Sequence, residues 1–415
     1  MKLLNFLINN KYFFIVTPHL YTIGNSTEEI YLSLIKARKE SRKVVLLTPF
    51  VCCYFYKRSI QCASIIKIPT PYNISQKNVL LIFVRFFFSL ISLSARILEV
   101  LTRKISKKEI KLLRDFALCP RIGINELYNP YKGDYKSIKK NTIKYDWNKE
   151  LEKKLDLMKF FPRTDAYKQI LSSLGLKKDQ KYVCLHIRSH QTYADGTLAR
   201  ERSCDENNYY KAINLLIKKG YMVVRMGDRN MPRMKLVNGL YDYAHSDLNN
   251  SANDQYLIAN CSFYIGTTSG IWGLGWMFEK DMIIVNNPSW EYSSPNSYSV
   301  DLYKRVFDKE ISRYLKLSEW IKDHHEALSF MEPIPKKYIF KENTSLEIRD
   351  AIKNYLSKKS LIDSQRHKVA KLVSSAALQY IEDNKMCSLD ILYRFYLMAS
   401  LCKGRIDPEF YKKYF

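Results

Sequence analysis

Glycine is scarce in this chain, at 13 of 415 residues, and the glycine-rich phosphate-binding signatures are missing with it. Neither a complete G-x-x-x-x-G-K-[ST] loop nor a complete G-x-G-x-x-G occurs, which disfavours a P-loop ATPase and an NAD-dependent dehydrogenase. A phosphate-binding site in this protein would therefore be built from arginine side chains and helix ends.

Cysteine gives no sign of a disulfide framework or a zinc site. The nine cysteines include one adjacent pair, Cys52 and Cys53, and no C-x-x-C spacing. This usage is typical of a reducing cytosol. No D-x-D motif stands near a predicted strand end either, so we expect no metal site.

A clean membrane-spanning run is missing as well. The apolar stretch 79–95 is interrupted by Arg85 and stays short of the roughly 20 residues that a span needs. Residues 78–104 are instead expected to form an amphipathic helix, which either lies in the interface of an anionic membrane or packs into a domain core. Its polar face recurs at intervals of three or four residues: Arg85, Ser89, Ser92, Arg96, Glu99 and Arg103.

Positive charge, in contrast, is abundant. Lys and Arg number 67 against 41 Asp and Glu, which gives a net charge of +26. Such a surplus favours an acidic partner, whether nucleic acid, anionic lipid or a phosphorylated substrate, although solvated lysine-rich faces would explain it equally well. The chain is long enough, and at 47% hydrophobic apolar enough, for two domains with cores of their own.

The N-terminal residues predict a strand, a helix and a second strand. Residues 11–19 form a short apolar run rich in aromatic and β-branched residues, which suits a buried parallel strand rather than a signal peptide. Ser26 or Thr27 can cap a helix whose first turn is acidic. Residues 43–50 suit a second strand, so this end of the chain is expected to be a Rossmann-like half.

A second alternating series begins near residue 182, after a lysine-rich linker that contains a predicted helix at 164–175. Ser251 and Asp254 match an S-x-x-D capping box at the start of one helix in this series. Strands are expected at 182–188, 221–228, 262–267 and 281–288, with helices between them at 205–220, 251–261 and 269–280.

Alternation of this kind is typical of a parallel sheet covered by helices. We therefore predict an α/β fold with two Rossmann-like domains that face a cleft. The domains are expected at 1–150 and 151–345, followed by a helical tail at 346–415, with no sheet beyond about residue 310.

Polar side chains follow the first strand of the second series. Ligands of open α/β sheets bind outside the carboxyl ends of the strands, so His186 and Arg188 are candidate site residues. Arginine offers a charged fork for phosphate oxygens, and histidine can hydrogen-bond a hydroxyl or act as a base. The alternatives are a histidine bonded to the backbone and an arginine paired with a carboxylate.

Two other strand ends carry similar residues. Arg225 and Asp228 follow the next strand. Thr268, Ser269 and Gly270 follow a third strand at the start of a predicted helix, whose free N–H groups would bind phosphate. Capping of that helix by Thr268 or Ser269 is the alternative.

In order and spacing, these segments resemble a family of bacterial glycosyltransferases from surface-polysaccharide gene clusters. The resemblance covers about 182–288, through VCLHIR, RSCDENNYYKAINLL, KGYMVVRMGD, DQYLIANCSFYIGTTSG and VNNP, and includes the terminal GRIDPEFYKKY. The H-x-R strand end is also similar to that of GT-B fucosyltransferases. In the loop IGNSTEEI, Asn25 stands where the family commonly has histidine, so this loop is not expected to supply a catalytic base.

The resemblance implies a GT-B-like fold in which Arg188 binds the donor diphosphate, His186 orients donor or acceptor, and the turn 268–270 contacts phosphate. The implied reaction moves a sugar from a nucleotide-sugar donor to a glycan or lipid-linked acceptor in cell-surface polysaccharide biosynthesis. Fixed cations and backbone donors would stabilise the leaving diphosphate, so neither a metal nor a cofactor is expected. The donor sugar, the acceptor and the stereochemical outcome stay open.

The catalytic base is less clear from the sequence. Asp195 is a candidate, and an aspartate chosen for its D-G turn is the alternative. Arg200 and Arg202 follow closely and could add charge for the donor. The expected location is the cytoplasm, with peripheral contact to an anionic inner membrane as an open alternative.

Two other functions compete with sugar transfer. A nucleic-acid-binding or anionic-membrane-binding protein without catalysis would use the net charge and the 31 tyrosines, but these are dispersed and no helix-turn-helix, zinc or RNP-like element occurs. We therefore expect no nucleic-acid partner. A metal-dependent hydrolase using His186, His190 and Asp195 would lack a regular ligand spacing.

Overall fold

The computed structural model describes most of residues 165–357 and a few short pieces elsewhere. The described residues are 165–177, 179–189, 200–288, 299–316 and 336–357, with 13–16, 27, 31, 43–46, 319, 405–406, 410 and 412–413. The chain divides into two compact units, Met1–Tyr145 with Lys153–Pro162 and Asp146–Glu152 with Arg163–Phe415. The amphipathic helix predicted at 78–104 and the tail between 357 and 405 lie outside the described residues.

In the first unit, two short strands lie side by side. Strands β1 (Phe13–Val16) and β2 (Lys43–Leu46) pair in parallel, with Phe13 opposite Lys43. Thr27 and Tyr31, one helical turn apart between them, are helical and buried. Both predicted strands are confirmed, and their parallel pairing fits a connection through a helix.

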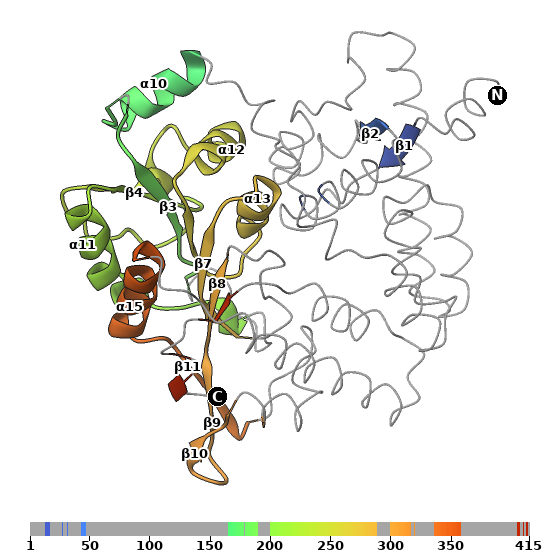
Figure 1. The fold of residues 1–415 in the computed structure, drawn as a ribbon, viewed down its shortest axis with the longest axis vertical. Helices are drawn as coiled ribbons and strands as arrows, with labels where there is room; N and C mark the ends of the chain where they lie inside the picture. The colour runs from blue at the N-terminus through green and yellow to red at the C-terminus, as the bar shows by residue number, and fades with distance from the viewer. Residues whose placement is uncertain are drawn as a thin grey trace. The chain divides into compact units, whose positions relative to one another are not determined.

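The second unit is built on a parallel seven-stranded sheet (Figure 1). Without its edge strand β12, the order in the sheet is 3-2-1-4-5-6 along the chain, which is the order of a doubly wound nucleotide-binding fold and reverses between β3 and β6. This confirms the predicted α/β class for the second unit. In spatial order the strands are β12 (Arg405–Ile406), β8 (Val300–Tyr303), β7 (Met282–Asn287), β6 (Tyr264–Gly266), β3 (Tyr182–His186), β4 (Met222–Met226) and β5 (Leu240–Tyr241).

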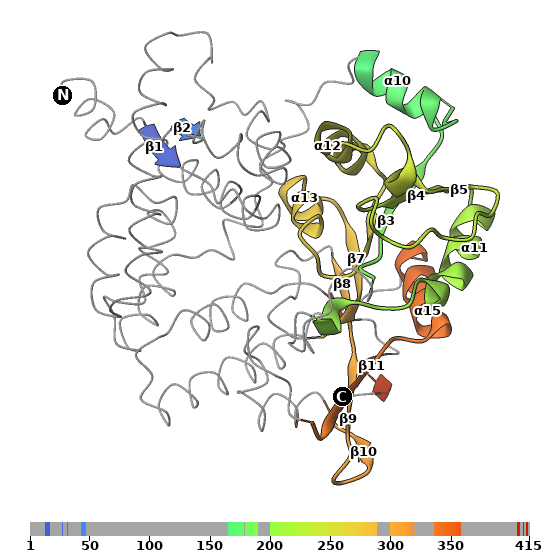
Figure 2. The same ribbon diagram turned by 180° about the vertical axis from the view of Figure 1, so that it is seen from behind.

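Helices cover both faces of this sheet (Figures 1 and 2). On one face, Val183 and Leu185 of β3 pack in a common core with helices α11 (Tyr210–Lys218) and α15 (Ser345–Leu356). Side chains alternate along a strand, so His186 belongs to the other face.

Three helices belong with that second face. In helix α12 (Ser251–Asn260), the Leu257 carbonyl accepts a hydrogen bond of 2.8 Å from the Tyr182 hydroxyl of β3. Helix α12 also packs against α10 (Asp165–Ser173) and α13 (Trp272–Met277). Short 3-10 turns complete the unit: Arg200–Arg202, Glu206–Tyr209 and Tyr243–His245. No helix among the described residues is both long and apolar enough to span a bilayer.

The prediction of no sheet beyond about residue 310 is wrong. A small antiparallel sheet joins β10 (Arg313–Tyr314), β9 (Arg305–Asp308) and β11 (Tyr338–Lys341), and β12 adds a parallel edge to the main sheet. Strands of two to four residues are too short to show a clear period of two, which is why the sequence pattern did not reveal them.

The cap of α12 also differs from the prediction. The Asn250 side chain accepts a hydrogen bond of 3.0 Å from the Asn253 amide, so Asn250 caps the helix. Ser251 is already the first helical residue, and the predicted capping box with Asp254 is wrong. Asparagine is as good a cap as serine, and the one-residue shift turns Asp254 toward the protein interior.

Candidate functional site

Two of the predicted site segments meet where the strand order of the main sheet reverses. His186 is the last residue of β3, and Arg188 lies two residues beyond it. The neighbouring strand β6 ends at Gly266, and Thr268 and Ser269 follow. In doubly wound folds ligands bind outside the carboxyl ends of the strands at this switch point. The structure therefore brings His186, Arg188, Thr268 and Ser269 to the place where a ligand is expected.

Backbone contacts fix the two segments against each other. The Thr267 amide donates to the His186 carbonyl at 3.2 Å, and the Arg188 amide donates to Thr267 Oγ1 at 3.2 Å. A Cβ at position 266 would lie 2.6 Å from the His186 carbonyl oxygen, so only glycine allows this approach. Thr267, which the sequence did not single out, is thus the residue that holds Arg188 in place after its strand has ended.

His186 reaches across to Ser269. Its Nδ1 lies 3.1 Å from Ser269 Oγ, and its Nε2 has no hydrogen-bond partner among the described residues. Burial, followed by the charges of Arg225 and Arg188, lowers the pKa of His186 to about 3. The imidazole is therefore neutral at physiological pH and a weak base, which suits a group that orients a ligand by hydrogen bonds rather than one that removes a proton.

The turn after β6 is not the helix start that the sequence predicted. Helix α13 begins at Trp272, and its N-cap residue Ile271 makes no side-chain cap. The Trp272 amide instead closes a turn onto the Ser269 carbonyl at 3.2 Å. Neither the predicted helix start at Ser269 nor the alternative of helix capping by Thr268 or Ser269 is what the structure shows. The Thr268 hydroxyl is buried and has no partner within the described part of the chain, which is costly unless a ligand supplies one.

Arg188 places a permanent positive charge beside this turn. Its side chain is buried, and its charge helps to lower the pKa of His186, after burial and the charge of Arg225. A buried guanidinium keeps its charge at every physiological pH and presents a fork of N–H donors.

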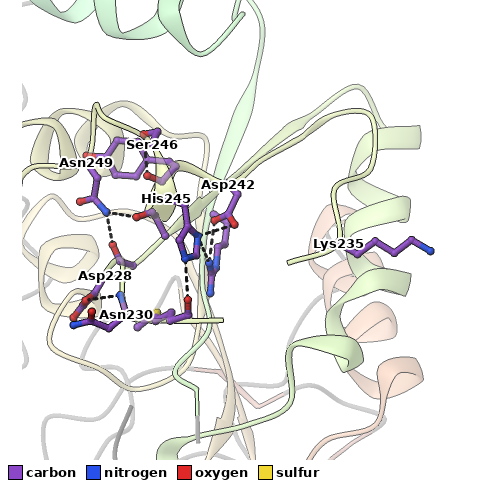
Figure 3. Close-up of polar contacts among 12 residues, drawn as sticks. Asp228, Asn230, Lys235, Asp242, His245, Ser246 and Asn249 are labelled. Carbon is purple, nitrogen blue, oxygen red and sulfur yellow. Dashed lines mark hydrogen bonds and ion pairs between the residues drawn. The ribbon is translucent and has the colours of Figure 1, made fainter. Parts of the chain in front are cut away.

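Arg225 occupies a different environment, beside Asp242 and His245, which are labelled in Figure 3. It is 1% exposed, and its Nη1 lies 2.9 Å from Asp242 Oδ1 and 3.3 Å from His245 Nδ1. The His245 ring is held on both sides, by Asp242 Oδ2 at 2.9 Å and by the Met231 carbonyl at 2.9 Å. Arg225 is therefore paired with a buried carboxylate, that of Asp242.

Asp228 lies in an exposed turn, next to Asn230 (Figure 3). Its Oδ1 accepts a long hydrogen bond of 3.4 Å from the Asn230 amide. The turn is fixed by Asn249, whose Nδ2 donates to the carbonyls of Gly227 at 2.9 Å and Ala244 at 2.7 Å. These bonds give Asp228 a structural position in a turn, at the carboxyl end of β4.

Asp254 was not among the predicted site residues, yet it is a buried carboxyl group. Its Oδ1 has no hydrogen-bond partner among the described residues. Burial raises its pKa to about 7; contact with Tyr243 opposes that shift, and the charge of Asp228 adds to it. The only sequence signal was an aspartate in the first turn of a helix, which normally faces solvent.

Some candidates cannot be placed. His190 and Asp195 lie outside the described residues, and Arg200 and Arg202 begin and end a 3-10 turn. Within the described ranges, no three His, Cys, Asp or Glu side chains are grouped so that they could hold a metal ion.

Comparisons with known proteins give structural likenesses only, because no family model and no curated protein matches the chain. The solved structure of E. coli ADP-heptose LPS heptosyltransferase II is 13% identical, with a TM-score of 0.36, over 67% of this chain and 85% of that one. A glycosyl transferase family 9 structure from Veillonella parvula DSM 2008 is 11% identical, with a TM-score of 0.39, over 83% of this chain and 97% of that one. Identity and superposition are both low, so the function has to be inferred from the switch point itself.

Proposed function

We propose that the protein is a glycosyltransferase of the GT-B type, which moves a sugar from a nucleotide-sugar donor to a glycan or lipid-linked acceptor in cell-surface polysaccharide biosynthesis. One observation carries the proposal. At the switch point of a doubly wound sheet, a buried arginine lies beside a neutral histidine and a buried threonine hydroxyl that has no hydrogen-bond partner among the described residues. This combination offers a fixed positive charge and neutral hydrogen-bonding groups, which suits a diphosphate joined to a sugar.

The chemistry assigned to each residue follows from its environment. Cleavage of a nucleotide-sugar leaves negative charge on the diphosphate, and Arg188 would stabilise that charge without first reorganising. His186, held by Ser269, would orient a sugar hydroxyl or a phosphate oxygen through its second ring nitrogen. The Thr268 hydroxyl would donate to a phosphate oxygen. Asp195 is proposed as the base that takes the acceptor proton.

The two units are assigned different tasks in this proposal. The second unit, which contains the doubly wound sheet, would bind the donor, in keeping with the predicted domain 151–345. The first unit, with the predicted amphipathic helix 78–104, would bind the acceptor. We place the enzyme in the cytoplasm, with peripheral contact to an anionic membrane where a lipid-linked acceptor is embedded, and we propose that it needs no metal.

A thermal-shift screen tests the proposal against its rivals. The purified protein is heated with GDP, UDP, CMP, dTDP and common sugar conjugates of these nucleotides, with and without EDTA, and in parallel with oligonucleotides and anionic vesicles. We expect one nucleotide class to raise the melting temperature equally in both conditions. A shift with oligonucleotides or vesicles alone would instead favour a basic binding protein, and a shift abolished by EDTA would contradict metal independence.

A further inference from the structure

A buried lysine lies at the carboxyl end of β8, in the same sheet as the proposed site. Lys304 directly follows that strand, and its side chain is only 1% exposed. Its amide donates to the Asn287 carbonyl at 2.7 Å, which ties it to the end of β7. Lysine is almost never fully buried unless its ammonium group is used, because removing that charge from water is costly.

The ammonium group is used to hold one peptide. Lys304 Nζ donates to the Ser203 carbonyl at 2.8 Å, and Glu201 Oε2 lies 3.9 Å away as a partial counter-charge. The N–H of the same peptide group belongs to Cys204, and it donates to the Arg188 carbonyl at 2.9 Å. One peptide plane is therefore held by Lys304 on its oxygen side and holds Arg188 on its nitrogen side.

Arg188 depends on such support because it lies beyond the ladder of β3. Hydrogen bonds that hold its backbone include one from its amide to Thr267 Oγ1 at 3.2 Å and one to its carbonyl from the Cys204 amide. A cation on a peptide oxygen also polarises the peptide and strengthens the bond that its N–H donates. Removing the ammonium group would free the Ser203–Cys204 peptide to rotate and loosen its hydrogen bond to the Arg188 carbonyl.

We propose that Lys304 is a positioning residue for Arg188, acting through the Ser203–Cys204 peptide without touching the ligand. The proposal rests on the proposed function insofar as Arg188 binds a nucleotide diphosphate. The clamp itself is a property of the fold and can be measured without a ligand.

Hydrogen exchange tests the clamp first. In Lys304→Met the Ser203 carbonyl loses its charge-assisted hydrogen bond, so the Cys204 amide of the same peptide should exchange about tenfold faster. The amides of β4 should keep their protection. Lys341→Met removes the same charge from an exposed site on β11 and should leave Cys204 unchanged. Lys304→Arg retains a cation and N–H donors, so the Cys204 amide should keep its protection. This variant is measured in addition, in case Lys304→Met is too unstable to study. Unchanged exchange at Cys204 in Lys304→Met would overturn the proposal.

Nucleotide titration then tests the action through Arg188. Lys304→Met should weaken the Kd for GDP or UDP about tenfold, and Arg188→Ala combined with Lys304→Met should bind no more weakly than Arg188→Ala alone. Independent, additive losses in the double variant would show that Lys304 does not act through Arg188. If the wild-type protein binds no nucleotide, the proposed function fails, and the exchange measurement alone still decides whether the clamp exists.

Discussion

Ser269 Oγ lies 3.1 Å from His186 Nδ1, which joins the ends of two neighbouring strands across 83 positions in the chain. The contact fixes the ring of a neutral histidine so that its second nitrogen has a defined direction. Orientation of this kind is what a group needs when it places a substrate without transferring a proton.

Ser269→Ala is predicted to impair donor use while leaving the fold intact. The variant loses the hydrogen bond between Ser269 and His186, so donor turnover should fall about tenfold and the melting temperature should change little. Turnover of the nucleotide-sugar identified by thermal shift measures the first effect. Ser262→Ala, at an exposed serine before β6, is the matched control and should keep full turnover. If Ser269→Ala turns over the donor as fast as the wild type, orientation of His186 by Ser269 plays no part in the mechanism.

Gly266→Ala should destabilise the switch point through steric overlap. The new Cβ would lie 2.6 Å from the His186 carbonyl oxygen, which is backbone and cannot move aside. A loss of about 1–3 kcal/mol is expected in urea unfolding, as for other overpacked sites. In Gly275→Ala the new Cβ meets the Met282 sulfur at 2.8 Å, and that flexible side chain can shift. Similar stabilities for the two variants would contradict the close approach of β3 and β6.

The sequence was informative for four strands whose burial on both faces leaves a clear apolar run. Strands β3, β4, β6 and β7 all fall within their predicted ranges, because each consists mostly of Val, Ile, Leu, Met and aromatic residues. The switch-point residues followed from this, since parallel strands bring their carboxyl ends to one edge of the sheet.

The sequence could not show which side chains pair when they are distant along the chain, or where a helix starts to within a few residues. Nothing near Arg225 predicts Asp242, because the turn between them decides which carboxylate it meets. The start of α13 was misplaced because Ser269 and Gly270 form a turn that delays the helix to Trp272. Lys304 resembles any surface lysine until the fold buries it.

Arg225 is predicted to matter for stability more than for the ligand. Arg225→Met leaves Asp242 buried with its main partner removed, so the free energy of unfolding should fall by about 3–5 kcal/mol in urea titrations. Adding Asp242→Leu removes the buried carboxylate and should restore part of the lost free energy of unfolding. A stable Arg225→Met protein that no longer binds nucleotide would instead place Arg225 in the binding site.

Asp254 should make stability depend on pH in a defined direction. Its folded-state pKa of about 7 lies above the ordinary value of 3.8, so the folded protein binds a proton more tightly than the unfolded chain between these two pH values. Stability from this group is therefore full below about pH 4 and is lost as pH rises towards 7. At about 1.4 kcal/mol per pKa unit, a shift from 3.8 to about 7 corresponds to a loss on the order of 4 kcal/mol.

Asp254→Asn isolates this effect, because His186 acts in the opposite direction over an overlapping pH range. The lowered pKa of His186 makes stability rise with pH between about 3 and its ordinary value of 6.5. In urea unfolding of both proteins at pH 4.5, 6 and 8, the free energy of unfolding of the variant relative to that of the wild type should increase with pH. A constant difference across the three pH values would mean that Asp254 ionises normally in the folded state.

The central claim, that Arg188 binds the donor diphosphate at the switch point, is tested most directly by donor turnover. Release of nucleotide from the nucleotide-sugar selected by the thermal-shift screen is compared for the wild type and a folded Arg188→Ala variant. We predict a loss on the order of a hundredfold in the variant with little change in melting temperature. Equal release by the two proteins would contradict the assignment of this edge of the sheet as the active site.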